Sequence, residues 1–253
     1  MLPPRRQAPI LVQLVDLFLM ELTNWRWAWR ATVITGTIAP LLSLLALGVF
    51  ARDSGQGTLA YVLTGNVVLS LMFGNLDRVQ SRFSFMRAMG TLDYFAMLPI
   101  EKYNLILATV FSFLLLSLPS LLVTILVGSL LLRIPIAPHP AILIVVPLAA
   151  ISLAGIGALI GVSVRRPEEG GSLSLVVTMV LTAMGPVIIP PQRLPAFMLT
   201  LGRLSPATYA ASAFRQALLG PVTGRILLDL AALAVFAAIS LWVVGRKMDW
   251  RQK

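Results

Sequence analysis

Long apolar stretches constrain this chain more than any other feature of its sequence. A helix needs roughly 20 mostly apolar residues to cross the hydrocarbon core of a bilayer, which is about 30 Å thick. Of the 253 residues, 58% are hydrophobic and only 12% are charged. Six stretches meet this requirement, so the sequence predicts an all-α membrane protein with six transmembrane helices. The expected spans lie at about 30–50, 58–76, 104–132, 141–164, 172–190 and 225–245.

The basic residues predict how these spans are oriented. Cytoplasmic loops of membrane proteins carry an excess of Lys and Arg. With six spans and a cytoplasmic N-terminus, 14 of the 20 Lys and Arg fall on the cytoplasmic side. Both termini are therefore expected in the cytoplasm. The net charge of +10 is spread over these loops, which favours membrane lipid over nucleic acid as a partner.

The segment before the first span, residues 10–29, predicts an amphipathic helix that lies on the inner leaflet. Gln13, Asp16, Thr23 and Asn24 share its polar face. The alternative is a cytoplasmic helix that packs against another protein. The apolar face of the expected helix consists of Leu11, Leu14, Val15, Phe18, Leu22, Trp25 and Trp29.

The sequence lacks the residues that most catalytic and metal sites require. It has no Cys, and its one His, His139, lies in a short loop. None of its three Lys follows a Gly-rich loop, so it has no P-loop for a nucleotide. The spans hold almost no ionisable residues, which disfavours an ion relay, and Asp229 is expected to pair with Arg225. We therefore expect no catalytic residue, metal or cofactor here, and a protein that is not itself an enzyme.

One expected cytoplasmic loop, residues 77–103, is unusually apolar. It contains the stretch FMRAMGTLDYFAMLPIEK, and exposed apolar patches often mark binding sites. Gly90 is expected to end one short helix, and Thr91 to cap the next. The residues alone leave two alternatives open. The second helix could be held across the membrane surface to fit a partner's groove, or it could pack against the inner leaflet.

Residues 190–220, before the last span, predict a helical hairpin on the outer side of the membrane. Four Pro residues and Gly202 interrupt this apolar segment, so neither half reaches spanning length. Two short helices are expected, at about 193–203 and 206–219. Irregular backbone at membrane depth has to be shielded by protein or water. The hairpin is therefore expected to be re-entrant or to lie on the outer face.

Two motifs make the chain resemble the permease subunits of type-2 ATP-binding-cassette (ABC) exporters. The stretch RAMGTLDYFAMLPI is similar to the family's cytoplasmic motif ER-x-x-GTLE-x-L-x-x-x-P, with Met86 in place of the acidic residue. The matching residues are Arg87, Gly90, Thr91, Leu92, Asp93 and Pro99. A second resemblance lies in RLPAFMLTLGRLSPATYAASAFRQALLG, and it is carried by Leu194, Pro195, Leu204, Pro206, Tyr209, Arg215 and Gly220.

The resemblance implies that residues 1–253 form a single permease domain in a bacterial or archaeal plasma membrane. Two such copies, identical or different, would pair with two ATPase subunits that bind the ATP. Residues 77–103 would form the coupling helix that contacts the ATPase, with Phe85, Met89 and Leu92 adding anchor area. The implied coupling residues are Phe85, Arg87, Met89, Gly90, Thr91, Leu92, Asp93 and Pro99. The outer hairpin, with Pro195, Pro206, Tyr209 and Arg215, would cap the exit.

The expected substrate pathway lies between the two permeases. Asn66, Ser70 and Phe73 share one face of the second span, at i, i+4 and i+7. Spans with so few charges suit a drug-like, lipid or amphipathic substrate. Two alternatives to export remain. One is a membrane scaffold or immunity subunit of an ATPase complex, and the other, disfavoured by the missing catalytic residues, is an intramembrane enzyme.

Overall fold

The computed structural model describes residues 9–25, 29–51 and 55–248, and all regular structure in these residues is helical. The all-α prediction is therefore confirmed. The elements in chain order are α1 (Ile10–Trp25), α2 (Trp29–Ala51), α3 (Gln56–Leu71), the π-helical turn η2 (Met72–Leu76), α4 (Asp77–Ala88), α5 (Thr91–Met97), α6 (Lys102–Leu132), α7 (Ile142–Ser163), α8 (Pro167–Ala183), the 3-10 turn η3 (Pro191–Arg193), α9 (Ala196–Gly202), α10 (Pro206–Leu219) and α11 (Arg225–Lys247).

Five helices among the described residues are long and apolar enough to cross a membrane. They coincide with the first, second, third, fourth and sixth expected spans. These helices are Thr32–Ala51, Gln56–Ala88, Lys102–Leu132, Ile142–Ser163 and Arg225–Lys247. The chain is therefore a multi-pass membrane protein.

The second spanning helix is much longer than the sequence predicted. It was expected to end at residue 76, where a loop would begin, but α3, η2 and α4 form one helix of 33 residues. At 1.5 Å per residue its length is about 50 Å, which exceeds the roughly 30 Å of hydrocarbon. The polar residues that follow position 76 therefore mark a helix leaving the apolar layer, and not the end of the helix.

The fifth expected span, residues 172–190, is only partly helical. The helix α8 begins earlier, at Pro167, and ends at Ala183, so it has 17 residues. Gly185 follows with φ of 115°, a left-handed conformation that side chains rarely adopt. A Cβ atom added to Gly185 would lie 2.8 Å from the Cα atom of Gly202. The close approach of these two glycines ends the helix and turns the chain toward α9.

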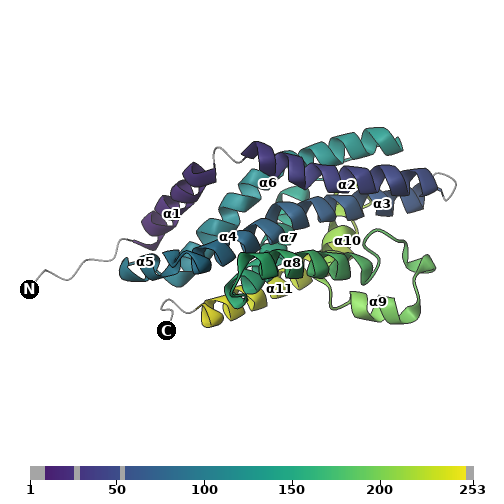
Figure 1. Cartoon of the computed structure of the whole chain (residues 1–253). Helices are drawn as coiled ribbons and strands as arrows, with labels where there is room; N and C mark the ends of the chain where they lie inside the picture. Colours follow the sequence, from purple (N-terminus) through teal and green to yellow (C-terminus); the bar gives the residue numbers. More distant parts are fainter. Residues whose placement is uncertain (1–8, 26–28, 52–54, 249–253) are drawn as a thin grey trace, which may run out of the picture.

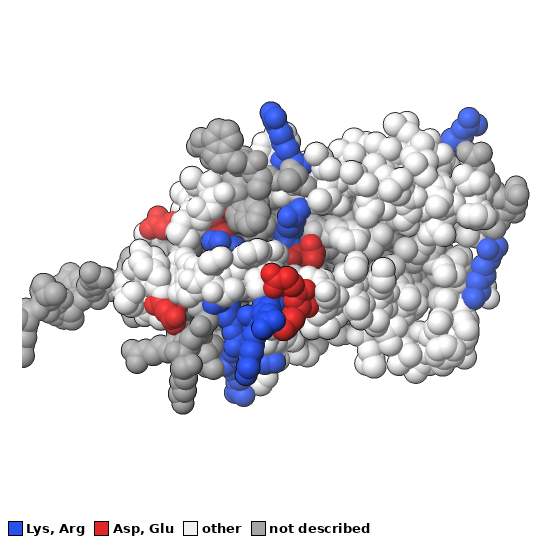
Figure 2. Space-filling view, viewed as in Figure 1, with Lys and Arg blue, Asp and Glu red and all other residues white. Residues whose placement is uncertain are grey.

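The two ends of the bundle differ in charge. At one end, hereafter the α5 end, lie α1, α5 and the C-terminal end of α11; α9 lies at the opposite end, hereafter the α9 end (Figure 1). Figure 2 shows that charged side chains gather over the α5 half of the visible face, whereas its middle is almost free of charge. This distribution matches an apolar layer across the middle, with the α5 end projecting beyond it.

Two hydrophobic clusters form the core. The larger one joins α3, α7 and α10, with Phe214 as its largest fully buried side chain. The second lies at the α5 end and joins residues of α1, α4, α5, α6, α7 and α11, including Leu17, Phe83, Leu92 and Val244. The short helix α5 is therefore packed into the core of the α5 end, and it is not a free loop.

Candidate functional site

The turn between α4 and α5 depends on Gly90. Its φ of 67° places it in the left-handed region, which favours glycine over any residue with a side chain. The amide of Gly90 donates to the Arg87 carbonyl (3.2 Å), and its own carbonyl accepts from the Asp93 amide (3.1 Å). Gly90 rather than Thr91 occupies the N-cap position of α5, and Thr91 is the first helical residue. This geometry fixes the direction in which α5 leaves α4.

Four large apolar side chains stand exposed around this turn: Phe85, Met89, Tyr94 and Met97, hereafter the α5 surface. Met89 and Met97 are the most exposed of them, at 74% and 73%. A cavity of about 310 Å³ opens beside them, and its lining consists of Arg82, Phe85, Met86, Met89 and Thr91. An exposed apolar patch beside a cavity is typical of a protein-binding surface.

Leu92 lies on the side of α5 that faces the protein, away from the α5 surface. It is 3% exposed, as is Phe95, and both pack into the hydrophobic cluster of the α5 end. Leu92 therefore anchors α5 to its own protein, although the sequence predicted it as an anchor for a partner. Pro99 is half-buried just after α5, and Asp93 is half-buried in its first turn. The α5 surface is thus carried on a helix whose inner face is fixed.

Arg87 connects this site to α7. Its Nη1 donates to the carbonyl of Val162, in the last turn of α7. A cation at a helix C-terminus satisfies a free carbonyl and interacts favourably with the helix dipole. The resemblance implies that Arg87 couples to the ATPase, and within this chain Arg87 links α4 to α7. The neighbouring Met86, which replaces the acidic residue of the similar motif, is buried.

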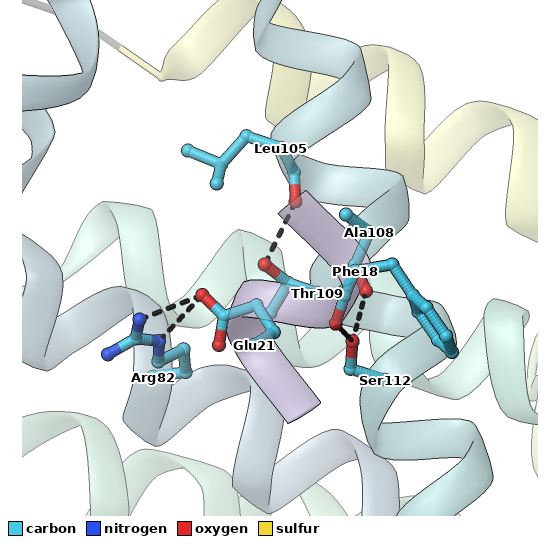
Figure 3. A network of polar contacts seen from close by, with 7 residues as sticks. All are labelled: Phe18, Glu21, Arg82, Leu105, Ala108, Thr109 and Ser112. Carbon is cyan, nitrogen blue, oxygen red and sulfur yellow. Dashed lines mark hydrogen bonds and ion pairs between the residues drawn. The ribbon is translucent and has the colours of Figure 1, made fainter. Parts of the chain in front are cut away.

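A buried ion pair connects the site to α1. Glu21 is fully buried, and its Oε1 accepts from Nη2 (2.7 Å) and Nε (3.2 Å) of Arg82 on α4 (Figure 3). Sequence reasoning missed this pair, because its two residues are 61 positions apart. The spacing of Gln13, Leu17 and Glu21, one turn apart on a single face, could have indicated the buried face of α1 but not the partner.

Further polar contacts hold α1 on α6, and they correct the expected position of Gln13. Gln13 was predicted on the outer polar face, but it is buried, and its Oε1 accepts from Asn104 Nδ2 (3.0 Å) and the Glu101 amide (3.3 Å). Ser112 donates to the Phe18 carbonyl at 3.4 Å (Figure 3). The exposed side chains of α1 include the apolar Leu11, Val12, Val15 and Leu19 and the polar Asp16, Thr23 and Asn24. Residues 26–28 of the expected helix lie outside the described residues.

The predicted pathway residues lie mainly inside the protein. Asn66 and Ser70 are fully buried, while Phe73 is half-buried. The Asn66 amide donates to the Val62 carbonyl (2.8 Å), and the Ser70 hydroxyl donates to the Gly36 carbonyl on α2 (2.9 Å). Within one copy Ser70 therefore joins α3 to α2, while the Asn66 bond lies within α3, and the role of these residues in a pathway stays a prediction.

The hairpin at the α9 end has the two short helices that the sequence predicted. Pro195 precedes α9, and Pro206 is the first residue of α10. The hydroxyl of Tyr209 donates to the Arg203 carbonyl (2.8 Å) and so closes the turn between the two helices.

Arg215 connects the hairpin to α3. Its guanidinium carbon lies 3.4 Å from the centroid of the Tyr61 ring. Burial lowers the pKa of Arg215 to about 10, so the side chain stays protonated at neutral pH. A cation over an aromatic ring is an attractive contact, and it is stronger when water is excluded.

Asp229 connects the hairpin to α11. It was expected to pair with Arg225, but it is buried, and its Oδ2 accepts from Ser212 (2.6 Å) and Gln216 (3.0 Å) on α10. Among the described residues no group of three His, Cys, Asp or Glu side chains could hold a metal ion.

In a comparison with protein families, one family model matches most of the chain. The family model described as ABC-2 type transporter matches residues 13–219, which include α1, the α5 surface and the hairpin. The comparison with curated proteins gave no match.

Proposed function

The chain belongs to the ABC-2 type transporter family, and on this premise we propose that it is the permease of an exporter driven by a separate ATPase subunit. Family membership makes it a membrane component of such a transporter. The proposal adds the direction of transport, the ATPase contact and a second permease copy. The α5 end would face the cytoplasm, together with both termini.

The observation that carries this proposal is the α5 surface. Phe85, Met89, Tyr94 and Met97 are exposed, and a partner on the cytoplasmic side would bury them. The helix beneath them is tied to α7 through Arg87 and to α1 through Arg82. A partner that pulls on this surface therefore acts on three helices at once. It can change the conformation only by binding one state more tightly than the other.

The proposed substrate is drug-like, lipid or otherwise amphipathic. The five spanning helices carry few charges, and an apolar pathway between two permease copies suits such a molecule. Asn66, Ser70 and Phe73 are the proposed pathway residues on α3 and η2. ATP would be bound by the partner, so the permease itself would hold no cofactor.

A pull-down from the native cell tests the proposal. We expect a P-loop ATPase to co-purify with the permease in equal stoichiometry. Met97→Asp should reduce its recovery at least tenfold, because it places a charge where apolar area would be buried. Leu204→Asp is the matched control, since Leu204 is equally exposed, at 74%, but lies between α9 and α10.

Two outcomes would change the conclusion. If no ATPase co-purifies, or if both variants lose it equally, the α5 surface is not the contact. If the ATPase binds but its activity in liposomes is unaffected by a panel of amphipathic dyes and lipids, the scaffold or immunity alternative replaces export.

A further inference from the structure

A buried π-helical turn interrupts the long helix between its apolar and polar halves. In η2 the amide of Asp77 donates to the carbonyl of Met72, five residues earlier. Met72, Gly74, Asn75 and Leu76 are all buried. A π-helical turn is rare, is usually a single turn within an α-helix and is frequently found at functional sites. The turn is therefore a local weak point, and it lies where α4 leaves the apolar layer.

Asn75 attaches this turn to a second weak point. Its Nδ2 donates to the Ser117 hydroxyl on α6 (2.8 Å), which in turn donates to the Leu114 carbonyl (2.8 Å). Pro119 lies two residues further along α6 and has no amide hydrogen to donate, so a helical bond is missing there as well. The least regular turns of two long helices are thus joined by one hydrogen bond.

Glycines bring the neighbouring backbones into direct contact with this region. A Cβ atom on Gly74 would lie 2.7 Å from the Ser117 Cβ atom. On α7, a Cβ atom on Gly157 would lie 2.1 Å from the carbonyl oxygen of Leu76. At these contacts η2 packs directly on α6 and α7, so the π-helical turn is held closely between the two helices.

We propose that Asn75 is a positioning residue for coupling: its bond to Ser117 holds the pivot at which α4 and α5 turn against α3 and α6. This inference rests on the proposed function, because the motion would start at the α5 surface. The bond passes that motion to α6. Oδ1 of Asn75 is buried and accepts no hydrogen bond from the described residues, so it is available to a donor in a second conformation.

Hydrogen exchange of the permease alone, in lipid nanodiscs, tests the pivot without the ATPase. Amides of residues 73–81 should exchange about tenfold faster than those of residues 62–71, although both segments are largely buried. Asn75→Leu and Ser117→Ala should each increase exchange further, and only from residue 73 to residue 97. Ser120→Ala is the matched control, because the Ser120 hydroxyl is buried and donates only within α6. Equal protection of the two segments would overturn the proposal, and so would a loss of protection throughout the bundle in Asn75→Leu.

The ATPase complex tests the coupling. In the wild type, ATP with vanadate should change exchange in residues 77–97 and also in residues 114–125 of α6. Asn75→Leu should keep the first change and lose the second. If the second change persists, the bond does not transmit the motion. If no complex forms, the proposed function fails, while the exchange of the isolated permease still decides whether the pivot exists. Ser117→Ala provides the same test where Asn75→Leu does not fold.

Discussion

At the scale of single residues, a few buried polar side chains carry the connections of the site. Glu21, Arg82 and Gln13 join α1 to α4 and α6 inside an otherwise apolar protein. Breaking such a pair leaves a buried charge without its partner, which costs far more than losing an exposed pair. These side chains therefore decide where α1 lies, even though most of α1 is apolar.

Glu21→Ala should destabilise the protein by about 3 kcal/mol, because it leaves Arg82 partly buried without its carboxylate. The measurement is thermal unfolding in detergent, followed by tryptophan fluorescence. Asp16→Ala is the control, since Asp16 is exposed on the same helix, and its effect should stay within about 0.5 kcal/mol. Equal destabilisation by the two variants would show that the ion pair does not hold α1.

At the scale of elements, α1 packs on the protein through the face of Gln13, Leu17 and Glu21, which its helical wheel does not single out. A helical wheel separates apolar from polar residues, but it does not show which face meets the protein. Glu21 finds a partner on α4 and Gln13 on α6, whereas Asp16, Thr23 and Asn24 stay exposed. The apolar residues Leu11, Val15 and Leu19 of α1 are left exposed as well, where lipid can cover them.

Spin labels on single cysteines test whether α1 lies against lipid, and the chain has no Cys that would interfere. A label at Val15 in liposomes should be more accessible to oxygen than to a water-soluble nickel complex, because it lies in the bilayer interface. A label at Asp16 should show the reverse. If both labels prefer the nickel complex, α1 does not lie against lipid.

The sequence predicted which segments are helical better than where the helices end. Apolar length found the five spanning helices, and Pro and Gly placed the two helices of the hairpin. The end of the second span was missed because the charged residues Asp77 and Arg78 end the apolar stretch and were taken as the end of the helix. Packing on α7 continues the helix to Ala88. The end of α8 was missed because the Gly185–Gly202 contact joins segments that are distant in sequence.

The site was predicted only in part, because local features can be read from the sequence and contacts between distant segments cannot. The motif identified Gly90, whose φ angle is a local property. It could not separate the exposed Met89 from the buried Leu92, because burial depends on what the rest of the chain places around α5. The Glu21–Arg82 pair spans 61 positions, so no local pattern reveals the partner.

At the scale of the whole molecule, the two ends of the bundle differ in charge and in structure. The α5 end carries most of the charge visible in Figure 2 and the exposed α5 surface. The α9 end carries a hairpin tied to α3 and α11 through Arg215 and Asp229.

Cysteine labelling in oriented membrane vesicles tests this arrangement. A cysteine at Tyr94 should react with a membrane-impermeant maleimide from the cytoplasmic side, and a cysteine at Leu204 from the opposite side only. The reason is that these two exposed residues lie at opposite ends of the bundle. If both react from the same side, the proposed six-span topology is wrong.

The continuity of α3, η2 and α4 sets a rule for building chimeras. Each residue of an α-helix turns the chain by about 100° and advances it by about 1.5 Å. Adding or removing one residue between Asp77 and Ala88 would therefore turn the α5 surface toward a different side of the molecule, with every contact residue still present. Partner specificity could be exchanged between related permeases by replacing residues 85–99, provided that the number of residues in α4 is kept.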